Sequence, residues 1–299
     1  MQTTTMKVVC ISFAIVSFLS HSLLAFSPAV SNLMQTHASK VSGLKEIASA
    51  YPDAPSDSVF YLRYCLSDKP EDEVASQLKS TLEWRSNEGK HICSAASVAV
   101  SAATAEGSWD NSPVREMAPH ASVVNKYITP SQCLTTTVNS GDLCYCIRAG
   151  KIDDVALMSE VSVEQMVDFF LYCKEVNALV ANMRSEQSDK LIQVLTANDL
   201  SGVKLIGGDA TFRKALGAAS TKANELYPNL SGPTFLLNLP KVLGALVKLF
   251  TPLLPEEVRK KLKFEQGPLK DVESLVEISP SGNKASRDLF LNQIDSLMT

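Results

Sequence analysis

The second half of the chain alternates between short apolar segments and long amphipathic ones. Strand-like composition marks residues 143–149, 191–199 and 234–240, and apolar residues recur at helical spacing over 161–184 and 210–228. Parallel strands need a crossover connection, which is usually a helix. The strand–helix–strand–helix order therefore predicts an α/β fold, in which a mostly parallel sheet is covered by helices.

The region before this alternation predicts a small all-α lobe. Asp57 or Ser56 can cap a helix that runs to about Leu66, and a second helix begins after Pro70 and ends at Gly89. The small, weakly charged residues that follow predict an irregular connection. We expect the following division of the chain: a signal peptide (1–26), a transit-like segment (27–50), a helical N-terminal lobe (51–93), a linker (94–113), an α/β domain (114–278) and a C-terminal helix (279–299).

The composition excludes some classes of partner. Hydrophobic residues make up 45% of the 299 residues and charged residues 20%, which is enough apolar material for a large core. The formal net charge is −4, so the chain lacks the strong positive field that holds nucleic acid. We therefore expect no nucleic-acid partner.

The first 50 residues have the chemistry of targeting segments. Lys7 precedes a long apolar run interrupted by serines, which is typical of a secretory signal. Residues 27–45 contain no acidic residue and carry two lysines and four serines, which is typical of a transit peptide. Residues 37–50 are either a short helix or the tail of that segment. Removal of Cys10 with the leader would leave six cysteines, an even number that permits pairing without requiring it.

The junction between these two segments resembles a known processing motif. The sequence Leu23–Pro28 is similar to the Ala-Phe-x-Pro cleavage motif of bipartite presequences, which target proteins to the secondary plastids of diatom-like algae. The resemblance implies a plastid protein that travels by the secretory route. Plain secretion, or residence in an endomembrane lumen, is the alternative.

The segment after the third predicted strand is unusually apolar. From Val242 to Leu254 the single charged residue is Lys248, yet the stretch is too short to span a bilayer. One interpretation is a fully buried helix. The other is a mobile cover over an apolar cavity, with one side toward a ligand and the other toward a membrane surface, because cations around an apolar helix favour anionic lipids. The flanking cations are Lys241, Lys248, Arg259, Lys260, Lys261 and Lys263.

Taken together, residues 224–264 resemble the signature of CRAL-TRIO lipid-binding proteins. The shared features are Tyr-Pro at 227–228, a strand ending in Asn-x-Pro at 238–240, an apolar gate helix and a Pro-initiated basic turn. The strand ending in Asp-x-x-Gly at 199–202 and the helical lobe at 60–89 match in the same order. The resemblance implies a CRAL-TRIO fold, with a small all-α lobe and a mobile gate helix. It also implies one bound hydrophobic molecule, such as a phospholipid, a pigment or a tocopherol-like compound.

The resemblance also implies headgroup contacts that can be compared position by position. Where phosphatidylcholine-binding members carry a tyrosine and a Ser/Thr pair, this chain has Tyr145 and Thr196, but Val194 replaces the serine. Where phosphatidylinositol-binding members carry a glutamate after Tyr-Pro, this chain has Asn229, which cannot supply the negative charge. The basic headgroup candidates are Lys69, Lys260 and Lys261.

Two sets of side chains are expected to enclose the ligand. The candidate floor of the cavity consists of Tyr145, Ile147, Val194, Thr196, Phe235 and Leu237. The candidate gate consists of Val242, Leu246, Val247, Phe250 and Leu254. A one-residue slip in register would invert the facing of any of these strands.

Signals for catalysis are weak in this sequence. Outside the targeting segment the histidines are His91 and His120, and neither lies in a recognisable nucleophile motif. The chain has no GxxxxGK[ST] phosphate loop and no GxGxxG fingerprint. Cys144 and Cys146 point to one face of a strand and are expected to be core or cavity residues, not metal ligands. We expect no metal, no cofactor and no enzymatic activity.

Three hypotheses for the function follow. The first is binding and transfer of one lipophile between membranes, in which the gate helix opens at a peripheral membrane surface. The second is a lipid-sensing regulatory module that has the same fold but no transfer activity. The third is an enzyme acting on small apolar substrates, which would require converging polar groups with perturbed ionisation in the pocket.

Overall fold

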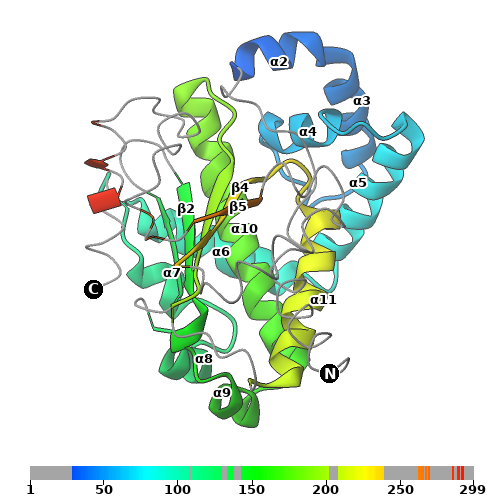
Figure 1. Ribbon diagram of the computed structural model, residues 1–299. Coiled ribbons are helices and arrows are strands. Elements are labelled where there is room, and N and C mark those ends of the chain that lie inside the picture. Colours follow the sequence, from blue (N-terminus) through cyan, green and yellow to red (C-terminus); the bar gives the residue numbers. More distant parts are fainter. Residues whose placement is uncertain are drawn as a thin grey trace, which may run out of the picture.

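A computed structural model describes residues 29–107, 109–129, 133–137, 143–201, 208–238 and 262–265, together with 267, 269, 285, 288, 289, 291 and 292. A helical lobe precedes a mixed α/β domain (Figure 1). The helices of the lobe are α2 (Val30–Thr36), α3 (Ala38–Ala48), α4 (Ser58–Cys65) and α5 (Glu71–Ser86).

The two helices predicted in the lobe are confirmed, the first with its cap at Asp57, while the second ends at Ser86, three residues before the predicted Gly89. Asp57 accepts a hydrogen bond from the Phe60 amide at 2.7 Å at the start of α4. Three acidic residues occupy the first turn of α5, where they complement the positive end of the helix dipole. The chain turns at Gly89, where an added Cβ would lie 2.4 Å from the Trp84 ring, so only glycine fits there without a shift.

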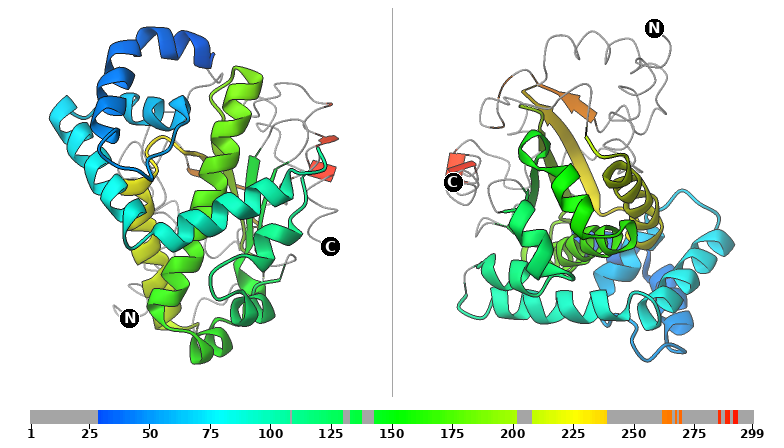
Figure 2. Two further views of the ribbon diagram at one scale, coloured as in Figure 1. Left: turned by 180° about the vertical axis from the view of Figure 1, so that it is seen from behind. Right: turned by 90° about the horizontal axis from the view of Figure 1, so that it is seen from below.

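The segment expected to be transit-like is folded into the lobe from Ala29 onward. Val41 and Leu44 are buried in one hydrophobic cluster with residues of α4 and α5. The Val30 amide donates to the Asp189 carbonyl at 3.0 Å, which ties this segment to the end of a helix in the α/β domain. Of the two interpretations offered for residues 37–50, the short helix is therefore correct. The blue helices in Figure 2 lie against the rest of the lobe.

The linker predicted over residues 94–113 is wrong for most of its length. Residues Lys90–Ala103 form helix α6, which packs along a long helix of the α/β domain. Three of its five buried residues are alanine, and small side chains allow two helices to approach closely. The same composition looks like a flexible segment in sequence, which explains the error. The buried residues of α6 are Ile92, Ala96, Ala99, Val100 and Ala103.

Two short helices lie between α6 and the sheet in the chain. Helix α7 spans Ser112–Glu116 and helix α8 spans Ala121–Tyr127. His120 precedes α8 with a φ of 60°, a left-handed conformation that breaks the helical path between them. The Tyr172 hydroxyl donates to the Val114 carbonyl at 2.8 Å and holds α7 against the domain.

The sheet confirms the predicted α/β class. Its five strands lie in the order β1–β2–β3–β4–β5, and the four strands from β2 to β5 are parallel. Strand β1 pairs antiparallel with β2 at the edge. Strands β1 and β5 and helix α9 (Asp154–Glu160) were not foreseen. The strands are β1 (Cys133–Thr137), β2 (Leu143–Arg148), β3 (Val194–Asp199), β4 (Ser231–Leu237) and β5 (Leu262–Phe264).

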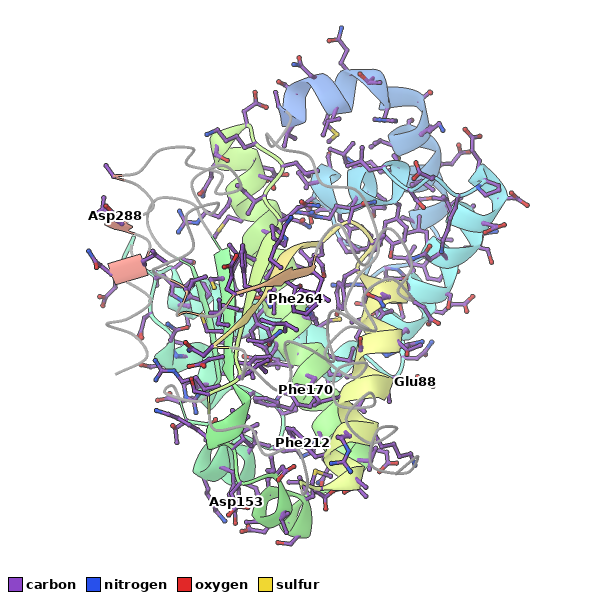
Figure 3. All side chains as sticks on the ribbon, in the orientation of Figure 1. Glu88, Asp153, Phe170, Phe212, Phe264 and Asp288 are labelled. Carbon is purple, nitrogen blue, oxygen red and sulfur yellow. The ribbon has the colours of Figure 1, made fainter. Side chains whose placement is uncertain are left out.

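Helices α10 (Val163–Ser188) and α11 (Ala210–Leu226) pack side by side over one face of the sheet (Figure 2). Ser162 and Gln165 form a capping box at the start of α10, and Asp209 caps α11. Phe170 and Phe212 meet between the two helices, with ring centroids 5.9 Å apart (Figure 3). The long helix α10 therefore forms the centre of the domain.

The lobe is joined to the domain by a buried ion pair. Arg85 of α5 binds Glu175 of α10 through two hydrogen bonds of 2.8 and 2.7 Å. Both side chains are almost fully buried, and the carboxylate raises the pKa of Arg85 above its ordinary value despite the opposing effect of burial. Loss of either partner would leave an uncompensated charge in the interior.

The C-terminal helix predicted over 279–299 lies largely outside the described residues. Those described there are helical: Ala285, Asp288, Leu289, Leu291 and Asn292.

Candidate functional site

One face of the sheet lies under helices α10 and α11. Tyr145 on β2 pairs in register with Thr196 on β3, and Thr196 pairs with Thr234 on β4. Directly paired residues of a sheet point to the same face, so these three side chains form a row. Tyr145 belongs to the hydrophobic core built with α10 and α11. We call this side of the sheet the helix-covered face.

Four of the six predicted floor residues share this face. Tyr145 and Val194 are buried in the core under α10 and α11, and Ile147 packs against that core while remaining partly exposed. Thr196 is 5% exposed and follows Val194 by two positions on β3, so it points the same way. Strands β2 and β3 therefore present these four residues to the helix-covered face.

The remaining two predicted floor residues point to the opposite face. Phe235 pairs with Ala197, and Leu237 pairs with Asp199, which places both on the side away from α10 and α11. Thr234 and Leu236 occupy the helix-covered face instead. The prediction of one continuous floor is therefore wrong for β4.

A β-bulge explains this inversion. Val194 pairs with Ser231 while Thr196 pairs with Thr234, so two steps on β3 correspond to three steps on β4. The extra residue lies at Gly232–Pro233, where proline cannot donate to the ladder. One extra residue in a strand reverses the face to which each following side chain points. Whether β4 contains this extra residue depends on how it pairs with β3.

The opposite face of the sheet is apolar and buried. Cys144 and Cys146 on β2 are 0% and 3% exposed, and their sulfur atoms lie 3.3 Å apart. Leu195 and Ala197 on β3 continue this surface toward Phe235. Both cysteines are free thiols, in agreement with the expectation that they are buried apolar residues.

A buried cation lies over the helix-covered face. The Lys174 ammonium of α10 is 5.7 Å from the centroid of the Tyr145 ring, and the residue is 5% exposed. Burial lowers the pKa of Lys174 to about 8, although the neighbouring Cys173 raises it. The predictions from sequence missed this residue. The available signal was a Lys-Glu pair at 174–175 that lies between the mostly apolar stretches 169–173 and 178–181 of this helix.

Two neutral polar side chains of the α/β domain are buried without a hydrogen-bond partner. Asn177 is 0% exposed, and neither atom of its amide has a hydrogen-bond partner in the described part of the chain. The same holds for the hydroxyl of Thr234, which is 1% exposed. A buried polar group without a partner costs about 1–3 kcal/mol. These atoms are therefore suited to meet polar atoms of a bound molecule.

Of the three basic headgroup candidates, Lys69 alone lies among the described residues. Lys69 is exposed, and its ammonium donates to Gln77 at 2.9 Å. The Gln77 amide in turn donates to the Glu225 carbonyl at the end of α11, so Lys69 lies beside the Tyr-Pro region. Lys260 and Lys261 lie outside the described residues, as do all five candidate gate residues: Val242, Leu246, Val247, Phe250 and Leu254.

Asn229 has a structural role in this chain. Its side-chain amide donates to the Arg63 carbonyl at 2.8 Å, and its own carbonyl accepts from the Arg63 guanidinium at 2.8 Å. The residue is 5% exposed and has a φ of 55°. The position where phosphatidylinositol-binding relatives carry a glutamate is therefore used here to hold the lobe.

The histidines form a surface cluster. His91 and His120 both approach Asp168, with nitrogen–oxygen distances of 3.4 and 3.6 Å. Among the described residues, no group of three or more His, Cys, Asp or Glu side chains is arranged to hold a metal ion. No helix in the described ranges has both the length and the apolar composition needed to cross a membrane.

Comparisons with known proteins found two similarities. Residues 132–279 match the family model of the CRAL/TRIO domain. The crystal structure of Sfh5 is similar over 79% of this chain and 80% of that chain, with 16% sequence identity and a TM-score of 0.45. No curated protein sequence is similar enough to this chain to be matched with it.

The molecule is thus an α/β protein whose parallel sheet is covered by helices and preceded by an all-α lobe. More specifically, the match to the CRAL/TRIO family model agrees with the resemblance in its sequence over residues 132–279. Domains of this family bind small lipophilic ligands.

Proposed function

We propose that this protein binds one hydrophobic molecule between the helix-covered face of its sheet and the surrounding helices, and that it transfers this molecule between membranes. The observation that carries the proposal is the CRAL/TRIO domain, a family of lipophile-binding domains. The helix-covered face supports it, because apolar side chains such as Val194 and Leu236 alternate there with neutral hydroxyl groups. Such a surface suits an amphiphile.

The energetics of such binding rest on the hydrocarbon part of the ligand. Burial of each methylene stabilises the complex by roughly 0.8 kcal/mol, so a long acyl chain needs few polar contacts. This argument requires no reactive side chain. We therefore propose a non-enzymatic function.

The apolar segment 241–254 is proposed to control access to the site. This segment connects β4 to β5, which are parallel neighbours in the sheet. Crossover connections of this kind are right-handed in nearly all proteins. The connections that contain α10 and α11 step across the sheet in the same direction, so the rule predicts segment 241–254 on the helix-covered side. We propose that it opens at a membrane surface and closes over the ligand.

Two measurements test this function. Extraction of the purified full-length protein, followed by mass spectrometry, should find a stoichiometric lipophile. Transfer of a fluorescent phospholipid between donor and acceptor vesicles should then be faster with the protein than without it. A filled site without transfer would favour the lipid-sensing regulatory module. Absence of any bound lipophile, after incubation with vesicles as well, would contradict the proposal.

We also propose that residues before Ala29 direct the protein to a plastid through the secretory route. The supporting features are the apolar run followed by the Ala25-Phe26 junction. Because residues from Ala29 onward are part of the lobe, processing should occur before that residue. Fusion of residues 1–28 or 1–50 to a fluorescent protein, expressed in a diatom, would test this. Secretion of both fusions, or their retention in the endomembrane lumen, would contradict it.

A further inference from the structure

Two thiol groups meet on the face of the sheet opposite helices α10 and α11. The sulfur atoms of Cys144 and Cys146 lie 3.3 Å apart, and both residues are almost fully buried. They flank Tyr145 on β2, and residues two positions apart on a strand share one face. Neither cysteine is in a disulfide. The lipophile site proposed above uses the other face of the sheet, so this pair of thiols has no role in it.

The pairing of β2 opposes a disulfide between these two cysteines. Strand β2 lies between β1 and β3, and Cys144 pairs with Thr136 on one side and with Leu195 on the other. Residues two positions apart in a strand are separated by about 6.6 Å, whereas the Cβ atoms of a disulfide must approach to about 3.5–4.5 Å. Hydrogen bonds to both neighbouring strands resist the backbone movement that would close this gap. We therefore expect the pair to remain a dithiol.

The surroundings of the two sulfur atoms favour an uncharged adduct. On β3 the residues paired with Cys144 and Cys146 are Leu195 and Ala197, and Phe235 follows on β4. A charge placed in such an apolar region is costly. Two thiolates that bind a monovalent ion such as Cu⁺ keep a net negative charge. Trivalent arsenic that carries one organic group forms a neutral compound with two sulfur atoms.

The short distance between the sulfur atoms favours the same ligand. Trivalent arsenic is pyramidal, so it holds its two sulfur atoms close together on one side. Two-coordinate mercury holds its sulfur atoms on opposite sides of the metal, which would require the thiols of Cys144 and Cys146 to move apart. A separation of 3.3 Å therefore suits arsenic better than a linear ion.

We propose that Cys144 and Cys146 form a chelating site for monosubstituted trivalent arsenicals, R–As(OH)₂. Each S–H bond is replaced by an S–As bond, and each thiol proton leaves with one hydroxide as water. Two water molecules are released, no atom is oxidised or reduced, and the site stays uncharged. This site goes beyond the proposed function and does not depend on it.

Phenylarsine oxide, which forms such a compound in water, is the probe for this site. Folded full-length protein is incubated with one equivalent of it and then with a large excess of glutathione, and native mass spectrometry counts the arsenicals retained. We expect one per chain, because the second S–As bond closes within the molecule and should raise the affinity about a hundredfold or more over that of a single thiol. Dimercaptopropanol should remove the arsenical. A wild-type protein that retains none overturns the proposal.

Four single substitutions locate the arsenical. Cys144→Ala and Cys146→Ala each leave one thiol of the pair, so retention in glutathione should fall about a hundredfold or more. Cys93→Ala and Cys173→Ala remove other cysteines and are the matched controls, which should retain the arsenical as wild type does. Circular dichroism verifies the fold of each variant. Undiminished retention by folded Cys144→Ala or Cys146→Ala, or its loss in either folded control, would assign the arsenical to other thiols and overturn the proposal.

Discussion

Arg63 and Asn229 bind each other's backbone across the boundary between the helical lobe and the α/β domain. Each side chain donates to the carbonyl of the other residue at 2.8 Å. The Arg63 guanidinium also donates to the Asn182 side chain at 2.8 Å and to the Ile192 carbonyl at 2.7 Å. One arginine of α4 thus joins three segments of the domain, and this explains why the lobe has a defined position.

Replacement of this arginine should destabilise the protein strongly. Arg63→Met removes one hydrogen bond from each of three buried acceptors, so we expect the free energy of unfolding to fall by about 3 kcal/mol. Urea unfolding followed by circular dichroism measures this. Lys79→Met, on the exposed side of α5, is the control and should stay within about 0.5 kcal/mol of wild type. Equal stability of the two variants would show that Arg63 does not hold the lobe.

Adjacent positions in α3 test whether the N-terminal segment is part of the lobe. Leu44 is 7% exposed, and Leu44→Ala should lower the free energy of unfolding by about 2–4 kcal/mol through the cavity it creates. Gly43 has open space around its Cα, and Gly43→Ala should raise that free energy by about 0.5–1 kcal/mol. Thermal unfolding of both variants in the mature chain provides the comparison. No effect of Leu44→Ala would mean that the segment does not pack there.

Two glycines should respond to alanine in opposite ways. Gly89→Ala places a methyl group 2.4 Å from the Trp84 ring and should lower the melting temperature by several degrees. Gly217→Ala, within α11, meets nothing within 4 Å and should raise it slightly because alanine favours the helix. Differential scanning calorimetry can resolve both shifts. A neutral Gly89→Ala would show that the turn after α5 relaxes without cost.

The buried lysine should give stability a specific dependence on pH. The pKa of Lys174 is about 8 in the folded protein and 10.5 in its unperturbed state, so the unfolded chain binds more protons between these values. Its contribution to the free energy of unfolding therefore rises with pH from about 8 to 10.5, by roughly 3 kcal/mol in total. Lys174→Met should be more stable than wild type at pH 7, and the difference should shrink as the pH approaches 10.

Wild type and Lys174→Met share all their other titratable groups. A comparison of the two proteins from pH 7 to 10 therefore isolates the contribution of Lys174 to the free energy of unfolding. Urea unfolding at several pH values gives the difference in free energy directly. A difference that stays constant from pH 7 to 10 would mean that Lys174 titrates near its ordinary pKa in the folded state.

The gate is tested by charges placed in its apolar stretch. Phe250→Glu or Leu246→Asp should abolish transfer of lipid between vesicles while leaving the protein folded, because a carboxylate in this segment opposes both closure over a lipophile and contact with an anionic membrane. Val98→Glu changes an exposed apolar residue of α6 and should leave transfer unchanged. Normal transfer by folded Phe250→Glu would contradict the assignment of the gate.

Local patterns in the sequence were sufficient to predict the helices that have a capping residue or a clear apolar periodicity. The cap at Asp57 and the apolar periodicity of α10 and α11 predicted these helices within a few residues. The order of strands and helices predicted the parallel sheet. Helix α6 was missed because its small buried residues resemble a linker, and only the neighbouring surface of α10 makes them a packing face.

The tertiary structure decided which side chains point to the helix-covered face. The bulge opposite Val194 turns Phe235 away from the helix-covered face and brings Thr234 onto it, and this follows from the pairing of β3 with β4. The burial of Lys174 likewise depends on the sheet beneath it. A sequence determines which residues prefer a helix, a strand or a core. The partner across a strand and the environment of a charge come from segments distant in the chain, and only the folded molecule brings those together.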